Sequence, residues 1–113
     1  MSQLADQQHK FSRMIPFLLT KAFELGYEVT ILECKRTKVQ ATANAQSGIG
    51  ISNSLHLISL AVDLALFKDG NYLTQFEDYK ALGEYWETLG GSWGGRFHNV
   101  DSDHFSLSFN GVK

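Results

Sequence analysis

The chain has 113 residues, of which 43% are hydrophobic and 19% are charged, and its formal net charge at pH 7 is −2. This length fits one domain over residues 1–113, and the composition excludes disordered and fibrous proteins. The lysines and arginines form no run that could follow a phosphate backbone, so no nucleic-acid partner is expected. The single cysteine, Cys34, cannot form an internal disulfide, so a core or a bound metal must hold the fold.

No stretch has the length expected of an export signal or a membrane-spanning segment. The apolar run at residues 14–19 contains Pro16 and is too short for the hydrophobic region of a signal peptide. We therefore expect synthesis in the cytoplasm, without stable membrane insertion. If the protein acts outside that compartment, a separate factor must release it.

The first predicted element is an amphipathic helix that ends at Gly26. Residues 1–10 are polar and are expected to fray, whereas apolar side chains then recur at helical spacing. These apolar residues are Phe11, Ile15, Leu18, Ala22 and Leu25. Pro16 lies within the pattern, so the regular helix either begins near Arg13 or kinks at the proline.

Two predicted strands with a long loop between them come next. Alternating side chains indicate a strand at residues 27–33, and the apolar run at residues 60–67 indicates a second strand, followed by a turn at residues 68–71. Residues 38–53 are small, polar and interrupted by glycine, which is typical of a loop. Loops of this length are often functional.

A second helix and a last strand complete the predicted elements. Thr74 and Glu77 form a capping-box pattern at the start of the helix, and Gly90 and Gly91 end it. The apolar face of this helix consists of Phe76, Tyr79, Leu82, Trp86 and Leu89. Residues 104–109 alternate between polar and apolar side chains, which indicates a strand.

Asp63 is an unexpected carboxylate within the apolar strand at residues 60–67. Because side chains alternate along a strand, Asp63 faces away from the neighbouring leucines and lies between Ala61 and Ala65. Such small neighbours leave space, and a carboxylate that is removed from water needs a cation to offset its desolvation. The pattern therefore indicates a cation site on this face of the strand.

Two histidines are suited to share a metal ion with Asp63. His104 lies on the polar face of the last strand, and His56 lies just ahead of the second strand. Two imidazoles, a carboxylate and a water form an open tetrahedral zinc site, which activates the water and polarises a carbonyl. A further carboxylate must move the proton, and Asp101 is preferred because Asp103 is expected to point to the other side of the strand.

Each of these signals also has a structural alternative. His56 could cap a loop, while Asp63 could pair with a lysine or arginine. His104 could be an exposed strand histidine, and Arg36 could form a surface salt bridge. Trp93 could be either a core residue or the wall of a cleft.

Three segments carry a motif pattern when they are taken together. Residues 33–40 read ECKRTKVQ, residues 54–63 read SLHLISLAVD, and residues 101–105 read DSDHF. They resemble, in order, the Glu-Gly-Tyr-Arg-Thr-x-x-x-Gln, Ser-x-His-x-x-Gly-x-Ala-x-Asp and Asp/Glu-x-x-His motifs of the zinc D-Ala-D-Ala carboxypeptidase and L-alanyl-D-glutamate endopeptidase family. The short single-domain form is similar to the peptidase domains of phage endolysins, which cut the stem peptide of bacterial peptidoglycan.

The resemblance implies a role for each motif residue. It implies one Zn²⁺ ion per chain, with the ligands His56, Asp63 and His104. Asp101 would be the general base, and Arg36 would bind the substrate carbonyl and stabilise the tetrahedral oxyanion. Ser54 and Gln40 would support the site or contact the peptide, and Trp93 is the third expected substrate-binding residue.

The fold implied by the resemblance is α+β, with a small antiparallel sheet flanked by helices, as in the signalling domain of hedgehog proteins. The predicted helices and strands agree with it. Ser59 stands where the family usually has glycine, so the turn after His56 must tolerate a Cβ atom. Cys34 and Lys35 replace the usual Gly-Tyr pair, which puts any substrate contact of that tyrosine in doubt.

The resemblance predicts a monomeric zinc metallopeptidase that hydrolyses the L-alanyl-D-glutamate bond of peptidoglycan, as a phage endolysin made in the host cytoplasm and acting on the cell wall after release. One alternative is a D-Ala-D-Ala carboxypeptidase. Others are an inactive zinc-stabilised wall-binding module and a purely structural fold. Asp101 and Arg36 favour the enzyme, because a structural zinc ion needs neither residue.

Overall fold

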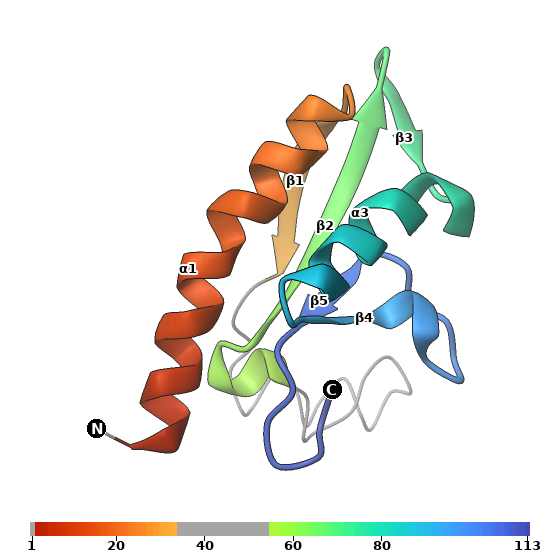
Figure 1. The fold of residues 1–113 in the computed structure, drawn as a ribbon. Helices are drawn as coiled ribbons and strands as arrows, with labels where there is room; N and C mark the ends of the chain where they lie inside the picture. Colours follow the sequence, from red (N-terminus) through yellow and green to blue (C-terminus); the bar gives the residue numbers. More distant parts are fainter. Residues whose placement is uncertain (1, 34–54) are drawn as a thin grey trace.

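The computed structural model describes residues 2–33 and 55–113, which form two long helices, two short 3₁₀ helices and a five-stranded sheet (Figure 1). In chain order the elements are α1 (Gln3–Glu24), β1 (Glu28–Glu33), η1 (Leu55–Ile58), β2 (Ala61–Lys68), β3 (Asn71–Leu73), α3 (Phe76–Thr88), β4 (Ser92–Trp93), η2 (Gly94–Arg96) and β5 (His104–Ser106). The predicted loop at residues 38–53 lies outside the described residues. Among those described, no helix combines the length and apolar character needed to cross a membrane.

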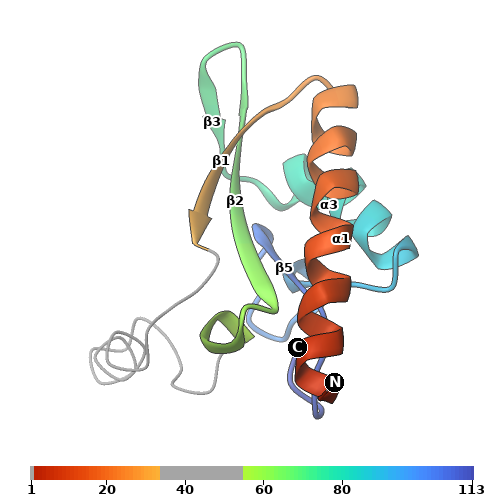
Figure 2. The same ribbon diagram turned by 90° about the vertical axis from the view of Figure 1, so that its left-hand side faces the viewer.

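The strand β2 is the centre of the antiparallel sheet. It pairs with β1 along one edge, and along the other edge with β5 near its start and with β3 near its end. The strand β4 extends the sheet beyond β5. Figure 2 shows α1 and α3 on the same side of this sheet. The predicted α+β fold, with a small antiparallel sheet and flanking helices, is confirmed.

The hydrophobic core fills the space between the two helices and one face of the sheet. The residues of β2 that face it are Val62, Leu64 and Leu66, and α1 adds Phe11, Met14, Leu18 and Ala22. The helix α3 adds Tyr79, Leu82 and Trp86. Because side chains alternate along β2, Asp63 is left on the face that turns away from both helices.

The helix α1 begins earlier than its apolar pattern predicts. The expectation that residues 1–10 fray is wrong, because α1 starts at Gln3 and the side chain of Ser2 caps it by accepting a backbone hydrogen bond. The amide of Gln8 also donates to the carbonyl of Ile58 at 2.8 Å. This contact with η1 stabilises the first turns of α1, which have few apolar side chains to pack against the core.

Two further helix boundaries differ from the predictions. The helix α1 runs through Pro16, so it does not begin near Arg13. The helix α3 begins one residue later than the Thr74 pattern indicates, because the Asp78 carboxylate accepts the backbone N–H of Gln75 at 3.1 Å.

Strand lengths differ from the predictions as well. The strand β5 covers only His104–Ser106 of the predicted residues 104–109. The sequence also misses β3, which pairs back onto β2 after a turn through Asp69 and Gly70, both of which have positive φ.

Candidate metal centre and active site

Asp63 and the two predicted histidine ligands converge on one point of the sheet. The pairing of β2 with β5 places Asp63 opposite His104, and His104 Nδ1 lies 3.2 Å from Asp63 Oδ1. His56 Nε2 lies 3.4 Å from the same oxygen. The fold therefore brings together three side chains that are 7 to 48 positions apart in the sequence.

His56 reaches this point because the chain turns sharply between η1 and β2. The turn is closed by the N–H of Leu60, which donates to the carbonyl of Leu55 at 3.0 Å. Ser59 occupies the left-handed region with φ +57°, where a Cβ atom costs about 1 kcal/mol. This is the position at which the family usually has glycine, so the turn does tolerate serine, but in a conformation that glycine adopts more easily.

The three side chains fit a zinc ion in both chemistry and spacing. Two imidazole nitrogens and a carboxylate oxygen are common zinc ligands, and ligands of a tetrahedral ion with bonds of about 2.1 Å lie about 3.4 Å apart. The separations of 3.2 and 3.4 Å from Asp63 match this value, and all three ligand atoms lie within 4.8 Å of one another. His56 and His104 are 2% and 6% exposed, so both are held firmly by their surroundings.

The charge of Asp63 also suits a cation. Burial alone would raise the pKa of this carboxyl, but hydrogen bonds and charge interactions with His104 and His56 outweigh burial and lower the pKa to about 2. Asp63 is therefore ionised at neutral pH.

The second ring nitrogen of His104 faces away from Asp63. This Nε2 atom is buried and has no hydrogen-bond partner among the described residues, and the ring packs beside Phe97.

Asp101 lies at the edge of this centre. Its Oδ2 atom is 3.9 Å from His104 Nδ1, and its side chain is 51% exposed. Carboxylate oxygens of Asp101, Asp63 and Asp103 all lie within 4.8 Å of one another. Asp101 is thus close to the metal ligands and open to water, as the predicted general base must be.

Asp103 is the residue that sequence reasoning misplaced. It was expected to point away from the site, but residues 102 and 103 form a turn before β5, where the alternation of a strand does not apply. Burial, a hydrogen bond with Asp101, and the charges of Asp63 and Asp101 together raise the pKa of Asp103 to about 7. The turn-forming residues of the DSD segment are the signal that could have identified it.

Of the two positions predicted for Trp93, the core or the wall of a cleft, the structure shows the core. The side chain is fully buried, and its indole nitrogen donates to the carbonyl of Ser102 at 2.7 Å. It offers no surface to a peptide, so the substrate-binding prediction for Trp93 does not agree with the structure. Arg36, Gln40 and Ser54 lie outside the described residues, and their roles stay predictions.

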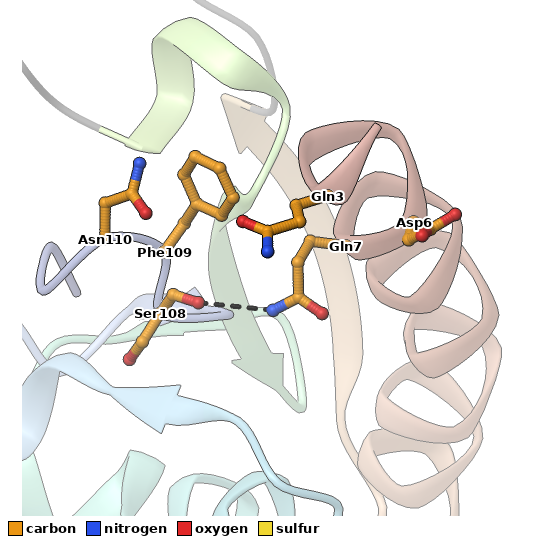
Figure 3. A pocket seen from close by; sticks show the side chains of 6 residues that line it. All are labelled: Gln3, Asp6, Gln7, Ser108, Phe109 and Asn110. Carbon is orange, nitrogen blue, oxygen red and sulfur yellow. Dashed lines mark hydrogen bonds between the residues drawn. The ribbon is translucent and has the colours of Figure 1, made fainter. Parts of the chain in front are cut away.

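A hollow of about 230 Å³ lies beside Asp101. It is lined by Tyr72, Leu73, Thr74, Tyr79, Val100, Asp101, Ser102 and Asp103. A second cavity, of about 400 Å³, lies between the start of α1 and the C-terminal segment (Figure 3). The side chains that line this second cavity include only one ionisable group, Asp6, so it does not resemble a catalytic site. Of these two cavities, the hollow is the one whose lining includes Asp101 and Asp103, the carboxylates next to the metal ligands.

Comparison with known proteins places the chain in a family. The family model described as D-alanyl-D-alanine carboxypeptidase matches residues 48–107, a segment that is more than half of the chain and contains His56, Asp63, Asp101 and His104. A comparison with curated proteins found no match.

Among solved structures, the chain is similar in fold to the L-Ala D-Glu endopeptidase ChiX of Serratia marcescens. The TM-score is 0.67, the sequence identity is 22%, and the match covers 81% of this chain and 76% of that chain. The likeness in fold and the family match agree. The chain therefore belongs to the D-alanyl-D-alanine carboxypeptidase family, whose members are zinc-dependent peptidoglycan peptidases.

Proposed function

We propose that the protein is a zinc endopeptidase that hydrolyses the L-alanyl-D-glutamate bond in peptidoglycan stem peptides. The observation that carries this proposal is the convergence of His56, Asp63 and His104 on one point, with Asp101 beside them. The likeness in fold to an L-Ala D-Glu endopeptidase supports the choice of this bond. The biological role that we propose is that of a phage endolysin, made in the host cytoplasm and acting on the wall after release.

Each residue of the site would have a separate role in hydrolysis. A zinc ion held by His56, Asp63 and His104 would supply Lewis acidity to the peptide carbonyl and to the attacking water. Asp101 is placed to accept a proton from that water and to return it to the leaving amine as the C–N bond breaks. A carboxylate oxygen of Asp103 lies within 4.8 Å of those of Asp101 and Asp63, so Asp103 contributes to the charge that surrounds the base.

A D-Ala-D-Ala carboxypeptidase is the second candidate, because the matching family model carries that description. Both candidates use the same residues and differ only in which bond enters the site. To separate them, the zinc-loaded protein is incubated with purified Gram-negative peptidoglycan, and the products are identified by mass spectrometry. The endopeptidase leaves L-alanine on the glycan strands and releases peptides that begin with D-glutamate, whereas the carboxypeptidase releases free D-alanine.

The variant Asp101→Asn tests whether the protein is an enzyme at all. It keeps the size of the side chain but removes the base, so we expect activity to fall at least about 10²-fold while one zinc ion stays bound. The matched control is Asp69→Asn, an exposed residue in the turn between β2 and β3, which should leave activity unchanged. If the native protein and Asp101→Asn both hold one zinc ion and both are inactive, the enzymatic proposal is abandoned in favour of a wall-binding module.

A further inference from the structure

The turn that carries Asp101 is anchored to the rest of the protein through its backbone. We call residues 101–103 the base turn. Its first residue, Asp101, donates its N–H to the carbonyl of Gly94 at 2.9 Å. Its last residue, Asp103, accepts the N–H of Leu64 at 3.0 Å. Since Leu64 directly follows the metal-ligand position 63, this second bond ties the base turn to β2.

The middle residue of the base turn is held by a side chain. The indole Nε1 of Trp93 donates to the carbonyl of Ser102 at 2.7 Å. Ser102 lies between the two carboxylate residues, so this bond restrains the peptide groups that join them. The N–H of His104 also donates to the carbonyl of Asp101 at 3.1 Å. Of these four bonds, the one from Trp93 is the one whose donor belongs to a side chain, so it can be removed by a substitution.

The indole of Trp93 sits in a closely fitting slot. A Cβ atom at Gly83 of α3 or at Gly95 of η2 would collide with the ring, so the absence of a side chain at both positions makes room for it. The ring of Phe76 packs against it at a centroid distance of 5.2 Å, and the Arg96 guanidinium lies 5.2 Å from the ring centroid. Such packing fixes the direction in which the indole N–H points.

We infer that Trp93 is a positioning residue for the general base. By holding the Ser102 carbonyl, its indole N–H sets the orientation of Asp101 relative to His104. The inference rests on the proposed function, because it takes Asp101 as the base. The three metal ligands do not depend on this bond, since Asp63 and His104 are held by the pairing of β2 with β5, and His56 by the turn that Leu60 closes on Leu55.

Trp86 provides a matched control within the same molecule. It is also fully buried, and its indole nitrogen donates to a backbone carbonyl, that of Ser106, at 2.8 Å. Ser106 lies at the end of β5, outside the base turn. The substitution Trp86→Phe therefore removes the same kind of bond and the same volume as Trp93→Phe, without releasing Asp101.

The test compares the two variants on a soluble stem peptide that contains the L-alanyl-D-glutamate bond. For Trp93→Phe we expect kcat to fall about 10- to 100-fold, because small displacements of a catalytic group are costly. We expect KM and the zinc dissociation constant, measured by competition with a chelator, to stay within about twofold. For Trp86→Phe we expect a similar loss of thermal stability, with kcat within about twofold of the native value.

The inference is overturned if the two variants lose kcat equally, or if Trp93→Phe loses zinc affinity together with kcat. If either variant does not fold, benzothienylalanine is placed at that position, because its sulfur replaces the indole N–H with little change in volume, and the same criteria apply. Asp101→Asn is measured in parallel. Full activity of that variant would refute the assignment of Asp101 as the base. If Asp101→Asn is inactive but Trp93→Phe and Trp86→Phe lose the same kcat, only the positioning role of Trp93 is refuted.

Discussion

The two faces of β2 show how differently one strand can be used. On one face, Val62, Leu64 and Leu66 are at most 3% exposed and belong to the core against the helices. On the other face, Asp63 contacts two histidines and is 22% exposed. The core face requires apolar volume, which several side chains could supply. The site face requires particular atoms at particular distances, so we expect substitutions on the two faces to have separable effects.

The largest effect is expected on the site face, from Asp63→Asn. Loss of the charged ligand should abolish zinc binding and lower activity at least about 10³-fold, which corresponds to about 4 kcal/mol of transition-state stabilisation. Far-UV circular dichroism should show a retained fold, because the core face is unchanged. Zinc should raise the melting temperature of the native protein but not that of the variant. Unchanged zinc affinity in a calorimetric titration would remove Asp63 from the ligand set.

On the core face, Leu64→Ala should lower stability but leave zinc binding unchanged. The free energy of unfolding in urea should fall by about 2–5 kcal/mol, because a fully buried leucine leaves a cavity. The zinc affinity of the folded variant should match that of the native protein. Ile31 pairs with Leu64 across β1 and β2 but is 55% exposed, so Ile31→Ala should cost less than about 1 kcal/mol. Equal losses for the two variants would contradict this account of the core.

The smallest effect is expected at Ser59, in the turn that leads from His56 into β2. Glycine removes the Cβ strain at φ +57° but also adds freedom to the unfolded chain, so Ser59→Gly should stabilise the protein by about 0.5 kcal/mol. Thermal unfolding measures this, with Ser59→Ala as the control that keeps the Cβ atom. A lower melting temperature for Ser59→Gly than for Ser59→Ala would show that the added freedom of the unfolded chain outweighs the Cβ strain.

The parts of the molecule that follow a local period could be predicted from the sequence. The alternation in β2 placed Asp63 opposite the leucines, and the spacing in α1 identified Phe11 and Leu18 as buried. The motif pattern identified His56, Asp63 and His104, which converge in the structure. The distances between them could not be predicted, because the alternation within one strand does not fix its position relative to other segments. Asp103 was misplaced because a strand rule was applied to a turn, and Trp93 because its burial depends on how the ring packs against Gly83 of α3 and Gly95 of η2.

The sequence by itself therefore determined the two helices, the strands β1, β2 and β5 in outline, the buried face of α1, α3 and β2, and the chemical types gathered for the site. These follow from backbone periodicity and side-chain chemistry, which act over a few residues. Only the tertiary structure decided that α1 begins at Gln3, that Asp103 joins Asp101, and that the indole of Trp93 holds the base turn. The start of α1 is supported by the contact of Gln8 with Ile58, a segment far away in the chain. The other two features depend on the turn before β5 and on the packing of β4 beside β5, which a local period does not describe.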